Sequence, residues 1–217
     1  MRVLRFTVLP VLALLPMTAE AQPRWDAAGA SGFFAGRRPV EDGRGYQEDW
    51  FQVAQGGVVV GRYLSRHLKL EIEATATTDG SRYRSYEIAV PGSPYPFWIT
   101  SEYRTSVRSL GAAALWQFRD NEWVHPFVEA GVSADVDRTV VHVPEQFYGP
   151  PRGDGSPPVR VAERRDETHT TTRVGGAIGG GAKVYFRERA FVRTDVRLTF
   201  DADRQNVMFR AGVGFDF

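Results

Sequence analysis

The sequence predicts an all-β fold, an eight-stranded antiparallel up-and-down transmembrane β-barrel. Segments that alternate apolar and polar residues recur along the chain, and short connections between them alternate with long ones. Within these segments, the polar positions are rich in charge and glycine. A wall between lipid and a polar lumen requires this combination, because one face of each strand meets hydrocarbon and the other faces the interior.

Residues 1–21 have the composition of a signal peptide. A positively charged start precedes an apolar core, and Ala19 and Ala21 place small residues where a signal peptidase reads them. We expect cleavage before Gln22, which leaves residues 22–217 as one barrel domain. The apolar core is too short to span a bilayer as a helix, and no other uncharged apolar stretch reaches the ~18 residues needed. A helical membrane protein is therefore excluded.

Charge and cysteine content exclude further classes of protein. The formal net charge is +1, and removal of the leader takes away Arg2, Arg5 and Glu20, which brings it to zero. A neutral chain gives no reason to expect a nucleic-acid partner. The sequence contains no cysteine, which excludes a lipid-anchored cysteine and a disulfide framework.

The first three strands are predicted over residues 25–36, 50–64 and 67–78. Small residues leave the facing of the first strand ambiguous, and the composition of residues 37–49 is that of a loop. Only two residues join the second strand to the third, so these strands must form a hairpin with a tight turn. The third strand alternates most clearly, with Leu68, Leu70, Ile72, Ala74 and Ala76 opposite Lys69, Glu71, Glu73, Thr75 and Thr77.

The fourth and fifth strands are predicted over residues 101–118 and 123–141, joined by a short turn. Long connections over residues 79–100 and 142–165 flank this pair, because proline and glycine in them interrupt a strand ladder. The apolar face of the fifth strand contains Val128, Ala130, Val132, Ala134 and Val136.

The last three strands are predicted over residues 166–186, 190–200 and 206–217, again with short connections. In the final strand, one parity contains Phe209, Ala211, Val213, Phe215 and Phe217, and the other contains Met208, Arg210, Gly212, Gly214 and Asp216. This strand therefore has an apolar face and a face of glycine and charge.

The alternating turns and the final strand closing on Phe217 resemble the small eight-stranded outer-membrane barrels of the OmpA/OmpX type. The resemblance implies periplasmic turns, extracellular loops, and a monomer surrounded by lipid in the cell outer membrane. It also implies that Phe215 and Phe217 form the signal by which the barrel-assembly machinery recognises the chain. A secreted lipocalin-like barrel is the competing fold, but charge on the inward parity is unsuited to its apolar cavity.

Aromatic residues near the short turns predict a girdle at the periplasmic interface. The expected members are Tyr63, Trp116, Phe118, Trp123, Phe186, Phe191, Phe215 and Phe217. We expect Phe34, Phe51 and Tyr103 in the extracellular girdle.

The inward parity predicts a charge network in the lumen. Its members are Glu71, Glu73, Glu129, Asp135, Arg173, Lys183, Arg193, Asp195, Arg197, Arg210 and Asp216. The interior of an eight-stranded barrel is only wide enough for side chains, so these charges must pair with one another. We predict a salt-bridged plug, for which inward glycines at positions 175, 179 and 181 make room; a gated ion path is the alternative.

No catalytic, cofactor or metal site is predicted. The glycine-rich stretch before Lys183 has Ala182 where a phosphate-binding loop needs glycine next to its lysine, and no two histidines have metal-ligand spacing. His169, with Asp166, Thr170 and Thr171 nearby, suggests an alternative that resembles the lipid-A-modifying barrel enzymes, whose motifs this chain does not match residue by residue. We therefore expect a protein that is not an enzyme.

The two long connections are the predicted location of function. They contain the candidate binding residues Tyr95, Phe97, Trp98, Phe147 and Tyr148, with several arginines beside them. Aromatic and arginine side chains are frequent binding anchors, so we expect any extracellular ligand, whose identity stays open, to contact these segments. In the alternative interpretation, the same residues only stiffen exposed hairpins.

Overall fold

The computed structural model describes residues 25–42, 45–89, 97–118, 121–148, 159–202 and 204–217. The predicted signal peptide lies outside these residues. The strands are β1 (Trp25–Asp42), β2 (Gly45–Tyr63), β3 (Leu68–Thr77), β4 (Gly80–Ile88), β5 (Phe97–Gln117), β6 (Val124–Val143), β7 (Gln146–Tyr148), β8 (Val159–Ala162), β9 (Arg165–Tyr185), β10 (Ala190–Phe200) and β11 (Gln205–Asp216). No helix among the described residues is long and apolar enough to cross a membrane.

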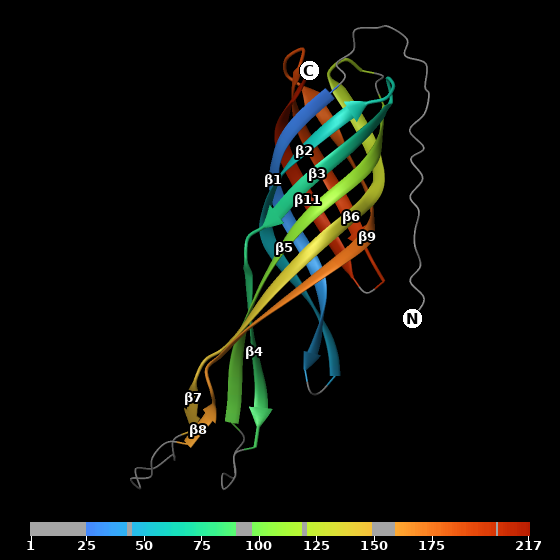
Figure 1. The fold of residues 1–217 in the computed structure, drawn as a ribbon. Coiled ribbons are helices and arrows are strands. Elements are labelled where there is room, and N and C mark those ends of the chain that lie inside the picture. Colours follow the sequence, from blue (N-terminus) through green and yellow to red (C-terminus); the bar gives the residue numbers. More distant parts are fainter. Residues whose placement is uncertain (1–24, 43–44, 90–96, 119–120, 149–158, 203) are drawn as a thin grey trace.

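The main sheet closes into a ring. Its order is β3-β2-β1-β11-β10-β9-β6-β5-β4, and pairing of β3 with β5 joins the two sides. The chain ends meet where β1 pairs with β11, from Asp26 opposite Asp216 to Gly36 opposite Asn206. Every pairing is antiparallel, and eight strands form the ring, which confirms the predicted up-and-down barrel (Figure 1).

The ninth strand, β4, continues β3 beyond a bulge. Pairing with β5 reaches Ala76 opposite Arg108 and resumes at Gly80 opposite Thr105. Between these two pairs, residues 77–79 lie opposite only residues 106 and 107 of β5. Such a β-bulge exchanges the inward and outward positions of the strand that follows it. The prediction of a loop over residues 79–100 was therefore wrong for residues 80–88 and 97–100, which form a hairpin. The prolines of that segment lie outside the described residues.

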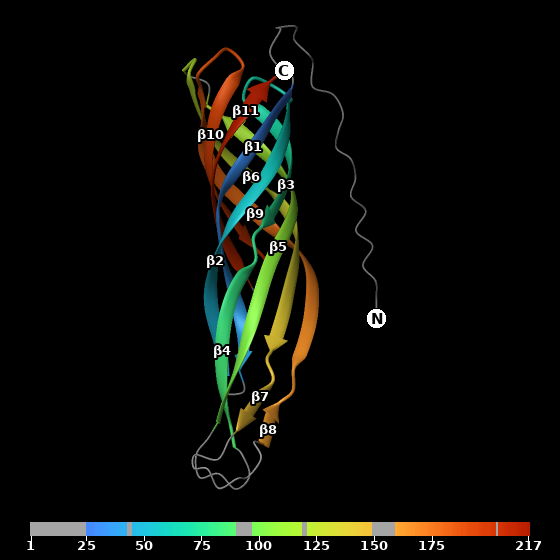
Figure 2. The same cartoon turned by 90° about the vertical axis from the view of Figure 1, so that its left-hand side faces the viewer.

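The connections between strands are short at one end of the barrel and long at the other. At the short-turn end, tight connections follow β2, β5 and β9, and the amide of Trp25 donates to the carbonyl of Phe217 at 3.0 Å. At the hairpin end, β1–β2, β4–β5 and β6–β9 extend past the wall, as Figures 1 and 2 show. The predicted connection over residues 142–165 also contains strand, because β7 and β8 pair as a separate ribbon.

The wall is apolar outside and polar inside, the reverse of a soluble carrier barrel. Six of the eight aromatics expected in one girdle are exposed at the short-turn end: Trp116, Phe118, Trp123, Phe186, Phe215 and Phe217. Phe191, by contrast, is fully buried, and Tyr63 shares the inward parity of its strand. These two assignments were wrong, because Phe191 has the same parity as the lumen residues of β10.

The expected girdle at the opposite end was also wrong for two residues. Phe34 and Phe51 are 2% and 4% exposed and pack inside the barrel with Val53, Val107 and Met208. Tyr103 is only partly exposed and also has inward parity. For Phe34 the error follows from the small residues of the first strand, which left its facing ambiguous.

Candidate functional site

The lumen contains a dense network of buried charges. Nine of the eleven predicted members are buried: Glu71, Glu73, Glu129, Lys183, Arg193, Asp195, Arg197, Arg210 and Asp216. They come from β3, β6, β9, β10 and β11, so strands that are far apart in the ring meet through them.

Arg193 is the centre of what we call the arginine layer. Its guanidinium donates to Glu71 at 2.7 Å, to Asp195 at 2.8 Å and to Glu129 at 3.3 Å. The ring of Phe127 lies under it, 4.7 Å from the guanidinium carbon. One side chain of β10 therefore connects carboxylates from three strands.

Two further arginines complete the arginine layer. Arg197 donates to Glu129 at 2.6 Å and forms an ion pair with Glu73. Arg210 donates to Glu73 at 2.6 Å and to Asp195 at 2.8 Å. Each guanidinium bridges at least two carboxylates, which is the arrangement that offsets the cost of burying charge.

A lysine layer lies between the arginine layer and the short-turn end. Lys69 donates to Asp26 at 2.7 Å and pairs with Glu71, which joins the two layers. Lys183 also pairs with Asp26, donates to the hydroxyl of Tyr63 at 3.0 Å and lies 3.7 Å from a carboxylate oxygen of Asp216. Sequence reasoning missed Asp26 and Lys69 as members, although the parity shared by Lys69 and Glu71 was a usable signal.

Asp135 and Arg173 lie apart from the arginine layer. They are cross-strand partners on β6 and β9, nearer the hairpin end, and both are partly exposed. Arg173 approaches Asp201 at 4.0 Å. Another pair at this level, Asp137 with Arg204, was not predicted.

An apolar layer covers the arginine layer on the side of the hairpin end. It consists of Phe34, Phe51, Val53, Val107 and Met208, and the two phenylalanine rings are 5.7 Å apart. Met208 is one inward position beyond Arg210 on β11. An ion moving along the lumen therefore meets both an apolar layer and a fully paired charged layer.

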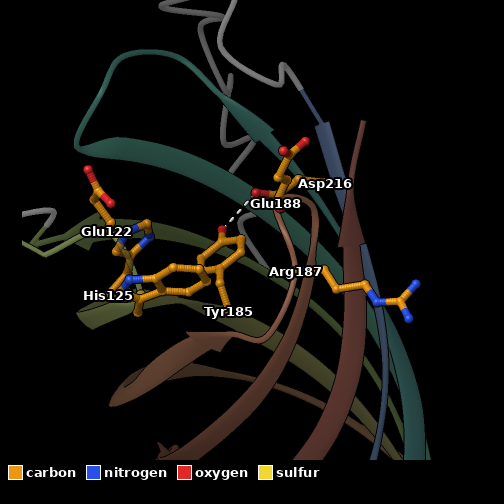
Figure 3. Close-up of a pocket in the computed structure, with 7 residues that line it drawn as sticks. Glu122, His125, Tyr185, Arg187, Glu188 and Asp216 are labelled. Atoms are coloured by element: carbon orange, nitrogen blue, oxygen red, sulfur yellow. Dashed lines mark hydrogen bonds between the residues drawn. The ribbon is translucent and has the colours of Figure 1, made fainter.

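The mouth at the short-turn end holds a cavity of about 320 Å³. Glu122, Trp123, His125, Tyr185, Arg187, Glu188 and Asp216 line it. Figure 3 shows Tyr185 pointing to Asp216, to which its hydroxyl donates at 2.7 Å. The His125 and Tyr185 rings are 4.8 Å apart. Within the described part of the chain, no cluster of His, Asp or Glu is placed to hold a metal.

We expect the purified barrel to give no steady open-channel current in a planar bilayer. The physical reason is that paired charges and an apolar layer leave no continuous water column in so narrow a barrel. Single-channel recording at several voltages is the measurement. A large, long-lived conductance from the unmodified protein would contradict the plug and favour a channel.

Four of the five candidate binding residues lie on the hairpins, Phe97 and Trp98 on β5 and Phe147 and Tyr148 on β7. Trp98 and Phe147 are about half exposed, at 53% and 51%, and Phe97 is partly buried. Tyr95 and the side chain of Tyr148 lie outside the described residues. Tyr83 and Tyr86, which face solvent on β4, add to this aromatic surface.

Polar contacts connect the extended hairpins to one another. The side-chain amide of Gln146 donates to the backbone carbonyl of Thr100 at 3.0 Å. The hydroxyl groups of Ser85 and Thr100 are hydrogen-bonded at 2.8 Å. A hydrogen bond from Arg104 lowers the pKa of Glu102. The β4–β5 hairpin is therefore in contact with the segment around Gln146 beyond the wall.

The residues named in the enzyme alternative are divided between the two faces of β9. Asp166 bonds His142, and this hydrogen bond lowers the pKa of the Asp166 carboxyl. His169 instead lies 3.6 Å from Glu167, and its position on β9 has the opposite parity to Asp166 and Thr170. His169 and Thr171 therefore lie on one face of the strand, and Asp166 and Thr170 lie on the other.

Phe215 and Phe217 face outward in the wall next to the short-turn end, and both are about half exposed. Their recognition by the assembly machinery stays a prediction.

Comparison with known proteins identifies relatives of this barrel. Residues 5–217 match the family described as outer membrane protein beta-barrel domain. The chain is similar to Neisserial surface protein A, with 12% identity, 89% of this chain and 97% of that chain covered, and a TM-score of 0.52. It is also similar to Ail, the attachment invasion locus protein of Yersinia pestis (12% identity, 89% and 99% covered, TM-score 0.48). At this identity the likeness concerns the fold alone. No curated protein sequence matches the chain.

Proposed function

The chain belongs to the family of outer membrane protein β-barrel domains, and we propose that it acts as a surface-interaction protein through its hairpin extension. We define the hairpin extension as residues 80–88, 97–104, 139–148 and 159–169. The barrel lies in the cell outer membrane, with lipid around its apolar wall. In such barrels the short turns face the periplasm, so the hairpin extension faces the outside of the cell.

One observation carries this proposal: the sheet continues past the wall and presents aromatic side chains to solvent. Tyr83, Trp98 and Phe147 are each more than half exposed on the extension. Arg160 is the cross-strand partner of Phe147 and forms ion pairs with Glu145 and Glu163. Exposed aromatic and arginine side chains on a rigid support are typical of binding surfaces.

The filled lumen supports the same proposal. Because the arginine layer and the apolar layer occupy the interior, the hairpin extension is the largest surface whose chemistry is free to serve a partner. We propose that the barrel is a monomer without catalytic activity, that its partner is an extracellular polymer or protein, and that the assembly machinery reads Phe215 and Phe217.

Shortening two hairpins tests the proposal. One variant replaces residues 79–104 and 139–169 with Asn-Gly turns, which keeps the eight-stranded ring. We expect cells that display this variant to lose at least about tenfold of the parent's adsorption to surfaces coated with a polyanion, a polycation or an apolar polymer, because the anchoring side chains are gone.

The matched control shortens a different hairpin. Deletion of residues 38–49, joined by the same turn, removes the end of the β1–β2 hairpin and leaves the proposed binding surface intact. Adsorption should then stay at the parent level. If the first variant inserts normally and adsorbs like the parent, function resides in the wall or the lumen instead.

A further inference from the structure

The outer surface of β5, β6 and β9 changes from apolar to cationic over one row of residues. Leu110, Ala134 and Val174 are cross-strand neighbours in the last fully apolar row. The next row toward the hairpin end contains Arg108, Val136 and Thr172, and the row beyond it contains Ser106, Arg138 and Thr170. The two arginines therefore lie at the edge of the lipid-facing belt.

Other parts of the wall end differently. On β1 and β10 the apolar belt ends in aromatic rings, Phe33 and Phe200, which are 67% and 47% exposed. Aromatic rings at this level are typical of the membrane interface. On β5 and β6, arginine takes their place, so this sector presents a different chemistry to the same lipid leaflet.

Arg108 and Arg138 are exposed and lack an ion pair or hydrogen bond within the described part of the chain. Arg104, four residues beyond Arg108 on β5, is instead held by Glu102 at 2.8 Å. The outward cross-strand neighbours of Arg108 and Arg138 are alanine, valine, serine and threonine. Two unneutralised guanidinium groups therefore lie on one face, with hydroxyl groups beside them.

We propose that Arg108 and Arg138, with the hydroxyl groups of Thr170 and Thr172, bind the phosphate groups of an outer-leaflet lipid. The arginines are diagonal neighbours on adjacent strands, a relation that places Cα atoms roughly 7–8 Å apart. Guanidinium groups at that spacing reach phosphates on one headgroup, and each binds through two parallel hydrogen bonds.

The apolar row below the arginines selects a lipid over a free anion. Leu110 and Val174 are 60% and 70% exposed, directly on the membrane side of the site. They offer a surface for acyl chains, whereas inorganic phosphate has nothing to place against them. This site faces sideways into the leaflet and is independent of the surface binding proposed for the hairpin extension.

A comparison of lipid affinities tests the proposed phosphate-binding site. The double variant Arg108→Gln/Arg138→Gln is compared with the parent for binding to lipid A that carries both phosphates and to dephosphorylated lipid A, by native mass spectrometry of the barrel in detergent. We expect the parent to prefer the phosphorylated lipid and the double variant to lose at least about tenfold of that affinity, since two sets of charged hydrogen bonds are removed.

Arg187→Gln/Arg189→Gln is the matched control, because it removes two exposed arginines at the short-turn end. Its affinity should equal that of the parent. Raising the salt concentration should weaken lipid binding to the parent, a readout that needs no variant. Equal binding of both lipids by the parent, equal affinity of the Arg108→Gln/Arg138→Gln variant, or displacement of the lipid by millimolar inorganic phosphate would overturn the proposal.

Discussion

The substitution Arg193→Met is expected to lower the free energy of unfolding of the refolded barrel by about 3–5 kcal/mol. Methionine fills part of the volume but leaves Glu71, Asp195 and Glu129 without their shared cation. Removing one partner of a buried network costs more than the network itself contributes, because uncompensated charge stays in the interior. Urea titration in lipid vesicles, followed by tryptophan fluorescence, measures the change.

Arg187→Met is the control for this experiment, because Arg187 is an exposed arginine at the short-turn end. Its effect should stay within about 0.5 kcal/mol, as for most surface substitutions. A loss below about 1 kcal/mol for Arg193→Met would mean that water or other side chains already neutralise the arginine layer. Its role as a structural plug would then be wrong.

The arginine layer also bears on how the ring closes. Glu71 on β3 and Arg193 on β10 are not on neighbouring strands, yet they meet across the lumen. Glu73 on β3 likewise joins Arg210 on β11. A shift of one residue in any of these strands would turn its charged side chains toward lipid. The network therefore favours one register as well as one closed ring.

Strand parity was predictable wherever large residues alternate with charge. The third strand is the clearest case, because Leu70 and Ile72 face outward while Glu71 and Glu73 are buried, as the alternation predicts. The first strand consists largely of glycine and alanine, which are tolerated on either face. Its facing follows only from pairing with β2 and β11, and for that reason Asp26 was missed.

The bulge between β3 and β4 was not predictable from local pattern. Asp79 and Gly80 have the composition of a turn, and the prolines farther on reinforce that interpretation. In the structure, the amide of Thr78 donates to Ala54 of β2 at 2.9 Å, and the amide of Val107 donates to the Thr77 hydroxyl at 2.8 Å. These contacts with β2 and β5 allow the strand to continue, and neither is visible in the local sequence.

The inward glycines, too, were only partly predictable from the sequence. Glycines that make room for charged side chains were expected in the predicted strand over residues 166–186, and a Cβ at Gly179 would indeed lie 2.7 Å from Glu129 Oε1. Gly61 on β2 was not singled out, although it lies beside the lysine layer. A Cβ there would overlap the carboxylate of Asp26, and it would lie 2.9 Å from Lys69 Cδ and 3.2 Å from Glu71 Cγ. The space above Gly61 is thus occupied by the side chains that join the two charged layers.

Gly61→Val is therefore expected to destabilise the barrel by at least about 3 kcal/mol, the upper part of the range for overpacking, because the new methyl groups also separate Asp26 from Lys69. Gly29→Val is the matched control: a Cβ at Gly29 meets nothing within 4 Å, and its cross-strand neighbours Val58 and Val213 face outward. That control should be neutral or slightly stabilising, since β-branched residues suit an outward strand position. Urea titration of both refolded variants in vesicles is the measurement. Equal stabilities for the two would show that the lysine layer yields to an added side chain, and that close packing around Gly61 contributes little to the plug.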